Sequence, residues 1–139
     1  MTVGASEARR RLSAVANDWS RAASSWNSAQ LTTLYSDDAL LFGGRSGHCV
    51  GAPAIHAYFR SYDGVISSAC LELVEQELRE MTPTCALAQG YCDFAFVLSG
   101  GRRTRSFLRT TLLLDWSGGP TRIRAHHFSP TPDAPPIGG

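Results

Sequence analysis

Two adjacent histidines near the end of the chain are the residues whose type and position point most directly to chemistry. His126 and His127 lie in segment 121–129, which is predicted to be a strand. Successive side chains of a strand point to opposite faces, so the pair cannot bind one metal ion and the two rings have different surroundings. An imidazole in a pocket can act as a general base or acid beside a carbonyl, because it titrates near neutral pH. We therefore expect one of these histidines to face a cavity.

Arginine supplies all 13 basic side chains, and the chain has no lysine. Schiff-base and lysine-nucleophile mechanisms are therefore excluded. Arg109 lies in a largely apolar segment, and a buried guanidinium needs an anionic partner. That partner is either a protein carboxylate, with Asp93 as the obvious competitor, or an acidic group of a bound molecule.

Other polar motifs are better explained as structure. Asp37 and Asp38 are adjacent acids at a predicted helix end, where such residues usually form turn and capping hydrogen bonds. Segment 43–47 is rich in glycine but lacks the Lys-Ser/Thr ending of a phosphate loop. His48 and His56 do not have the spacing of metal ligands. We expect neither a metal site nor a phosphate-binding loop.

Three helices are predicted in the first half of the chain. Apolar residues at helical spacing indicate an amphipathic helix over about 6–25. Ser28 can cap a second, short helix that ends at residues 37–38. A third helix opens at Pro53, in the first turn where its missing N–H costs little.

The second half of the chain is predicted to be extended. A short strand at 39–42, a turn at 43–47 and a returning strand at 48–50 form a hairpin. Four longer strands follow at 68–81, 84–98, 102–116 and 121–129. Helices followed by an antiparallel meander indicate an α+β domain over residues 1–129, and the Pro/Gly-rich residues 130–139 are expected to be a mobile tail.

Composition is that of an ordinary globular protein. The chain has 139 residues, 43% hydrophobic and 18% charged, with a net charge of +1, so one domain is expected and a dedicated nucleic-acid binder is not. No segment reaches the ~20 apolar residues of a membrane span, and the first residues lack the apolar core of a signal peptide. The four cysteines have no C-x-x-C spacing. We expect a cytoplasmic protein with reduced thiols and no membrane partner.

The order of elements and several motifs resemble the SnoaL-like branch of the NTF2-like superfamily. The resemblance covers nearly the whole chain except the tail. The residues that carry it are Trp19, Trp26, the run 34–39 (Leu-Tyr-Ser-Asp-Asp-Ala), the hairpin 47–51 leading to Ile55, Tyr58 and Phe59, the pair Arg109 and Thr111, and Ile123 with 126–129 (His-His-Phe-Ser).

This resemblance implies a cone, in which three helices close one side of a strongly bent, mainly antiparallel sheet around an apolar pocket. Alternation from Ile123 as the inward anchor then places His127 in the pocket and His126 on the outer face. The Arg-x-Thr pattern favours Arg109 and Thr111 beside His127. The wall of the pocket is expected from Trp19, Tyr58 and Phe94, with Phe96.

The resemblance also implies a homodimer through the outer face of the sheet. If the strand at 102–116 is apolar on both faces, its aliphatic face, with Leu108, Leu112 and Leu114, is expected to form that interface.

The steroid isomerases of this superfamily use an aspartate base and a tyrosine on the first helix. Here those positions fall on Gly43 and Trp19, and neither can do the original job. The resemblance therefore implies a small apolar ligand with a polar or acidic group, and any chemistry would be cofactor-free isomerisation, cyclisation or dehydration. In that case His127 moves the proton and Arg109 stabilises the oxyanion. The alternative is a non-catalytic module for ligand binding or oligomerisation, like the related association domain of calmodulin-dependent kinases.

Overall fold

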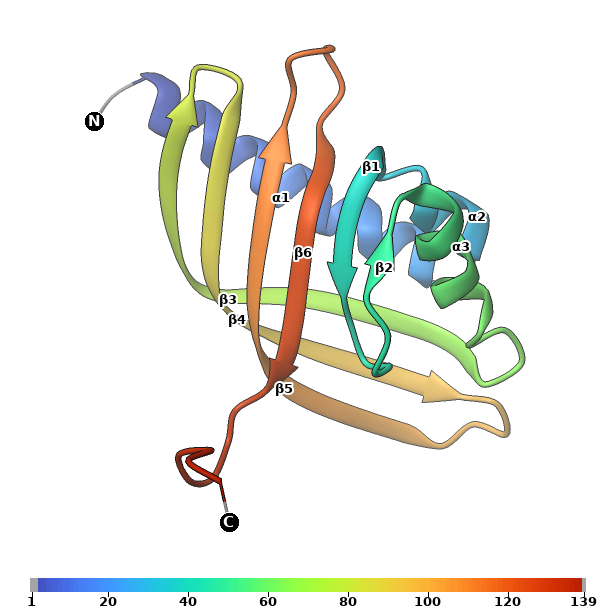
Figure 1. The fold of residues 1–139 in the computed structure, drawn as a ribbon. Helices are drawn as coiled ribbons and strands as arrows, with labels where there is room; N and C mark the ends of the chain where they lie inside the picture. Colours follow the sequence, from blue (N-terminus) through green and yellow to red (C-terminus); the bar gives the residue numbers. More distant parts are fainter. Residues whose placement is uncertain (1–2, 139) are drawn as a thin grey trace.

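The computed structural model describes residues 3–138 of the chain. Within this range the chain forms a curved sheet with helices packed on one side (Figure 1). The elements in chain order are α1 (Val3–Ala23), α2 (Ser28–Thr32), β1 (Tyr35–Phe42), β2 (Cys49–Val50), α3 (Ala52–Arg60), β3 (Ile66–Thr82), β4 (Cys85–Leu98), β5 (Arg103–Asp115) and β6 (Arg122–Pro130). The predicted α+β architecture is confirmed.

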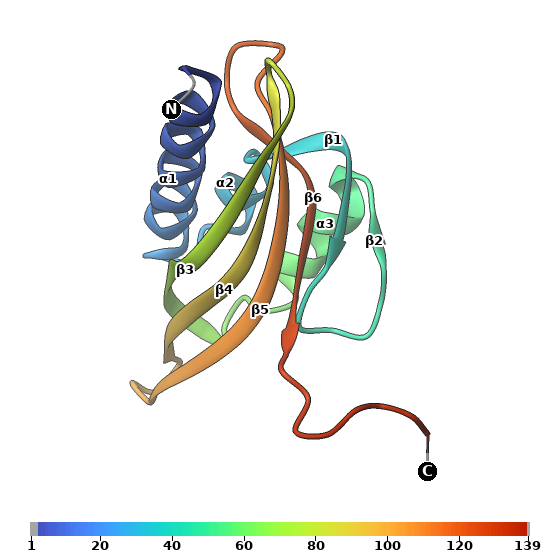
Figure 2. The same cartoon turned by 90° about the vertical axis from the view of Figure 1, so that its left-hand side faces the viewer.

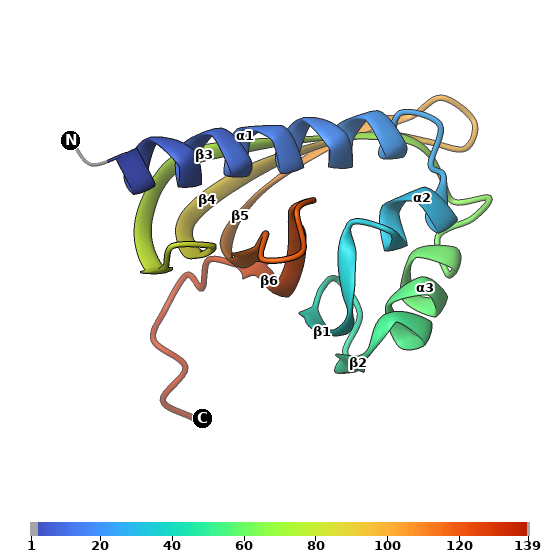
Figure 3. The same ribbon diagram turned by 90° about the horizontal axis from the view of Figure 1, so that it is seen from above.

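Helix α1 is amphipathic, as its residue spacing predicts, and its apolar face lies against the sheet. Its buried side chains recur at three- and four-residue intervals: Ala8, Leu12, Val15, Trp19, Ala22 and Ala23. The helix packs mainly on β3 and runs along one side of the sheet (Figure 3). The Oγ of Ser20 joins the two elements, since it accepts from the Leu71 N–H at 2.9 Å. On the buried face of the same helix, Trp19 is 2% exposed.

Helix α2 is shorter than predicted and has a different cap. The side chain of Asn27, not Ser28, accepts a hydrogen bond from the Gln30 N–H at 3.0 Å. Asn27 has an extended backbone, as an N-cap residue requires. The helix ends at Thr32 rather than at residues 37–38.

Strand β1 begins earlier than predicted, so Asp37 and Asp38 lie in a strand and not at a helix end. Both are exposed, and Asp38 forms an ion pair with Arg124 at 3.5 Å. Tyr35, expected in the second helix, is the first residue of this strand and is buried. The pairing of β1 with β6 determines this boundary, because the ladder starts with Tyr35 opposite Ile123.

The hairpin and the third helix are found where the sequence predicts them. Strand β2 returns antiparallel to β1, and α3 follows with Pro53 in its first turn. The side chains that α3 buries are Ile55, Tyr58 and Phe59. This helix forms the second wall of the interior.

The six strands form one mixed sheet in the order β2-β1-β6-β5-β4-β3. The four predicted long strands correspond to β3, β4, β5 and β6, and these pair antiparallel in sequence order. Only β1 and β6 are parallel among the described pairs. This parallel pairing places the first strand of the chain beside the last.

The long strands bend at a bulge in β3. The register between β3 and β4 shifts between Val74 and Glu77, and Glu75 has a positive φ of 52°. Gly90 of β4 lies against this bulge, where an added Cβ would stand 2.3 Å from the Glu75 carbonyl oxygen. Figure 2 shows β3, β4 and β5 sweeping through the bend. A glycine at this point allows the two backbones to approach.

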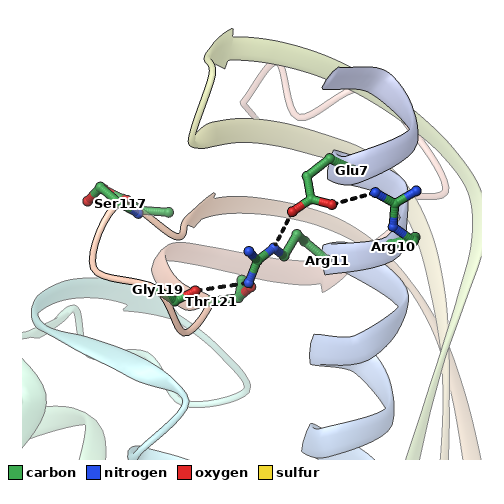
Figure 4. A network of polar contacts seen from close by, with 7 residues as sticks. Glu7, Arg10, Arg11, Ser117, Gly119 and Thr121 are labelled. Carbon is green, nitrogen blue, oxygen red and sulfur yellow. Dashed lines mark hydrogen bonds and ion pairs between the residues drawn. The ribbon is translucent and has the colours of Figure 1, made fainter. Parts of the chain in front are cut away.

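A polar network ties the start of α1 to the turn between β5 and β6 (Figure 4). Arg11 donates from Nη1 to the Gly119 carbonyl at 2.9 Å and to Thr121 Oγ1 at 3.2 Å, and from Nε to Glu7 at 3.0 Å. Its guanidinium lies 5.4 Å from the centroid of the Trp116 ring. These contacts fix the first turns of α1 to the end of the sheet where β5 turns into β6.

Candidate functional site

Strand β6 carries a bulge at Arg124 that reverses its inward face. Leu114 pairs with Ile123, and the next residue of β5, Leu113, pairs with Ala125. Arg124 is therefore the extra residue of the ladder. Because side chains alternate with a period of two, one extra residue moves every later side chain to the opposite face.

The prediction that His127 faces the interior and His126 the outside is wrong for this reason. Ile123 is buried as expected, but the next fully buried residue is His126, which is only 3% exposed. His127 is exposed on the outer face of the sheet. The simple alternation counted from Ile123 failed at the bulge.

His126 belongs to a buried chain of polar side chains. The indole N–H of Trp19 donates to Tyr35 Oη at 3.3 Å, and Tyr35 Oη lies 2.8 Å from Nδ1 of His126. An indole can only donate, so Tyr35 accepts from it and keeps its own hydrogen for His126. Nδ1 is then an acceptor, and Nε2 carries the ring proton.

Burial keeps this row of hydrogen-bonded side chains neutral. Burial lowers the pKa of His126 to about 3, with a smaller contribution from His127, and burial raises the pKa of Tyr35. The Nε2 atom of His126 is buried without a hydrogen-bond partner among the described residues. His126 is therefore a neutral donor inside the core, not a base ready to take a proton.

Arg109, Thr111 and His127 do come together, but on the outer face of the sheet. They line a hollow of about 510 Å³ that also contains Glu75 and Glu77. The expectation that this trio faces the interior pocket is wrong, because β5 turns its other face inward.

The inward face of β5 is the one predicted to form the dimer interface. Leu112 and Leu114 are 1% and 0% exposed and belong to the core, so that expectation is also wrong. Asp93, the expected competitor for Arg109, forms an ion pair with Arg105 instead. Arg109 lies opposite Tyr91 and is exposed.

The interior holds a separate cavity of about 310 Å³. Most of its wall is aromatic, and the helices and the sheet contribute from opposite sides. The lining residues are Trp19, Trp26, Gly43, Gly44, Tyr58, Phe59, Tyr62, Ile66, Phe94, Phe96, Ser106, Leu108, Phe128, Ser129 and Pro130.

Four of the residues predicted to line a pocket, Trp19, Tyr58, Phe94 and Phe96, lie in this wall. Trp26 and Phe128 were not assigned to it. Phe128 lies two residues beyond His126 on the same strand, so it would have followed from the correct inward face of β6. Trp26 lies in the turn after α1, and the sequence marks it only as one of the residues that carry the family resemblance.

The two tyrosine hydroxyls of this wall lie at the Gly43–Gly44 turn. The Gly44 N–H donates to Tyr58 Oη at 2.8 Å, and burial raises the pKa of Tyr58. The indole N–H of Trp26 is bonded to the Phe59 carbonyl at 3.1 Å. The polar side chains that line the cavity are therefore tyrosines, tryptophans and the serines Ser106 and Ser129, and none is a carboxylate, histidine or arginine.

Comparison with known families agrees with this architecture. The family model of the SnoaL-like domain matches residues 12–133 of the sequence. The chain belongs to the SnoaL-like family. The expected resemblance to the NTF2-like fold is thereby confirmed, and the SnoaL-like domain extends over all of α2, α3 and the six strands.

The solved structures that are similar to this SnoaL-like domain belong to proteins of several different names. A proposed calcium/calmodulin dependent protein kinase II association domain from Xanthomonas campestris has a TM-score of 0.81 at 20% identity, over 90% of this chain and 89% of that one. An NTF2-like superfamily protein from Salmonella enterica has a TM-score of 0.77 at 17% identity, over 97% and 99%. A proposed scytalone dehydratase from Novosphingobium aromaticivorans has a TM-score of 0.76 at 13% identity, over 100% and 99%. At these identities the similarity establishes the fold alone.

None of the curated proteins matches this SnoaL-like chain in sequence. Among the described residues, no helix has the length and apolar character needed to cross a membrane.

Proposed function

We propose that this SnoaL-like protein binds a small apolar molecule in its interior cavity. The observation that carries this proposal is the cavity of about 310 Å³ with its aromatic wall. Pockets for small molecules are typically concave and mainly apolar, with a few polar groups that orient the ligand. The tyrosine hydroxyls at the Gly43–Gly44 turn supply such groups.

The chemistry of the wall favours binding over proton transfer. A cofactor-free isomerase, cyclase or dehydratase needs a base within hydrogen-bond reach of its substrate. The lining residues include no carboxylate, histidine or arginine. His127 and Arg109, the expected catalytic pair, lie on the outer face, and His126 is neutral and hydrogen-bonded behind the wall. The ligand-binding version of the module is therefore the one we propose.

Binding can be measured with N-phenyl-1-naphthylamine, a neutral dye whose emission rises in apolar sites. Ser106→Phe places a large ring in the cavity, and Thr111→Phe places the same ring on the outer face of the same strand. The dye should bind the wild type and Thr111→Phe equally and should not bind Ser106→Phe. Dye emission that Ser106→Phe leaves intact would place the binding site elsewhere and overturn the proposal.

We also propose that two copies associate through the outer face of the sheet. The strand register aligns one apolar row across five neighbouring strands: Val50, Leu40, Ala125, Leu113 and Leu87. Leu40 and Val50 are 43% and 62% exposed. Five strands about 4.8 Å apart give a row about 20 Å long, which suits an interface of ordinary size.

A further inference from the structure

We infer that the interior cavity selects a neutral aromatic molecule with a hydrogen-bond acceptor, and that Tyr58 and Tyr62 supply the donor. This inference rests on the proposed binding function. Of the polar or acidic group that the family resemblance implied for the ligand, it retains the polar one, and it follows from the charge, shape and free hydrogen-bonding capacity of the wall.

The charge of the wall excludes ionised ligands. Tyr58 and Tyr62 are the only titratable side chains among its lining residues, and burial raises the pKa of the Tyr58 phenol. A carboxylate or ammonium group in this site would lose its water without gaining a counter-charge. The nearby Arg45 is already engaged, since its Nε donates to Ser61 Oγ at 3.2 Å and its guanidinium lies 4.3 Å from the centroid of the Tyr62 ring.

The shape of the wall favours an aromatic ligand. On the sheet side, the Phe94 ring stacks with Phe96 at 5.7 Å and meets Phe128 at 5.2 Å between centroids. On the helix side, the Tyr62 ring meets Trp26 at 5.9 Å and Tyr58 at 5.4 Å, both edge to face. Rings on both sides of the cavity offer faces and edges to a planar ligand. Aromatic pairs prefer the offset-stacked and edge-to-face arrangements that such a wall allows.

The two tyrosine hydroxyls have a hydrogen to spare. Tyr58 Oη accepts from the Gly44 N–H at 2.8 Å, so this bond does not use the hydrogen of the phenol. A Cβ built on Gly44 would lie 2.9 Å from Tyr62 Oη and 3.6 Å from Tyr58 Oη, which shows that both hydroxyls converge there. If one hydroxyl donates to the other, the second hydrogen is still free. The pair therefore offers at least one donor and calls for an acceptor such as a carbonyl oxygen.

Gly43 keeps the approach to this donor open. A Cβ at this position would stand 2.4 Å from Tyr58 Oη and 3.0 Å from the Phe128 ring. A side chain there would occupy the space beside the hydroxyl that a ligand oxygen needs. Gly43 stands where the steroid isomerases have their aspartate base, and its lack of a side chain leaves room for a polar contact.

The test compares three probes of one skeleton, naphthalene, 2-acetonaphthone and 2-naphthoate, by equilibrium dialysis at pH 8 with wild type and the double variant Tyr58→Phe/Tyr62→Phe. The ketone should bind the wild type about tenfold tighter than naphthalene, as one net hydrogen bond predicts, and naphthoate should bind most weakly. The double variant should lose the tenfold preference while keeping its affinity for naphthalene. Tyr91→Phe, on the outer face, is the matched control and should behave as wild type.

The outcomes separate this inference from the proposed function. Failure of all three probes to bind would refute the cavity as a ligand site. Three results would overturn the inference while leaving the binding function intact. Naphthalene could bind as tightly as the ketone, the preference for the ketone could survive in the double variant, or naphthoate could bind most tightly of the three probes. Gly43→Ala gives a second check, because it should weaken the ketone more than naphthalene.

Discussion

Tyr35 and His126, 91 residues apart in the chain, share a hydrogen bond of 2.8 Å in the centre of the core. The bond links β1 to β6, the parallel pair formed by the first and last strands. The hydrogen bond from the Trp19 indole to Tyr35 extends this network to α1. One hydroxyl therefore connects three elements, and its loss should be felt by the fold as a whole.

Replacing Tyr35 with phenylalanine removes this hydroxyl and leaves two buried partners, Trp19 Nε1 and His126 Nδ1, without their bonds. A buried polar group that loses its partner costs about 1–3 kcal/mol, and we expect a loss of that order in the free energy of unfolding. Urea denaturation followed by tryptophan fluorescence measures it. Tyr91→Phe, which removes a surface hydroxyl, should change stability by less than about 0.5 kcal/mol. Equal effects of the two variants would contradict a structural role for the Tyr35 bond.

Stability should fall when the pH is lowered from 7 to 5, because of His126. Its pKa is about 3 in the folded protein, against an ordinary value of 6.5. Between these values the unfolded chain binds the proton and the folded chain does not, so unfolding is favoured as the pH falls through this window. The expected loss is about 2 kcal/mol between pH 7 and pH 5. Glu7 and Asp115, whose pKa values are lowered, lose their contributions at lower pH.

Urea titrations at the two pH values measure this dependence. In His126→Phe the histidine-linked loss should disappear, even if the variant is less stable at pH 7. His127→Gln, on the outer face, should keep the wild-type dependence. A wild type as stable at pH 5 as at pH 7 would mean that His126 can be protonated in the fold.

The sequence predicts the elements well because their patterns are local. Helix α1 follows from its apolar spacing, and the long strands follow from the turns that separate them. The pocket residues Trp19 and Phe94 were found from the family resemblance, which implies a pocket between the first helix and the sheet. The boundary between α2 and β1 was missed, since the parallel ladder of β1 with β6 outweighs a weak helical pattern.

The orientation of His127 could not be obtained from alternation alone. The bulge at Arg124 arises from the pairing of β6 with β5, which is a contact between strands and not a property of either segment. The residues Ile123, His126 and Phe128 do break a strict period of two, and that break is the only local trace of the bulge. On β5 both faces carry apolar residues, so the sequence offers no decisive reason to turn Arg109 outward.

Gly90→Ala should destabilise the bend of the sheet. The added methyl group would stand 2.3 Å from the Glu75 carbonyl oxygen, and a backbone atom cannot move aside as a flexible side chain can. Overpacking of this kind typically costs about 1–3 kcal/mol. Gly118→Ala is the matched control, since its Cβ meets no atom within 4 Å. Thermal unfolding should show a lower midpoint for Gly90→Ala only, and equal midpoints would mean that β3 and β4 separate at the bulge without cost.

Leu40→Glu should dissociate the proposed homodimer. Leu40 is 43% exposed and lies in the apolar row between Val50 and Ala125, where a carboxylate would be desolvated against the second copy. Sedimentation equilibrium should give a dimer for the wild type and a monomer for this variant. Val65→Glu places the same charge at a residue that is 50% exposed and precedes β3, away from the row, and it should remain a dimer. A monomeric wild type, or a Leu40→Glu dimer of unchanged affinity, would show that the two copies do not associate through this face.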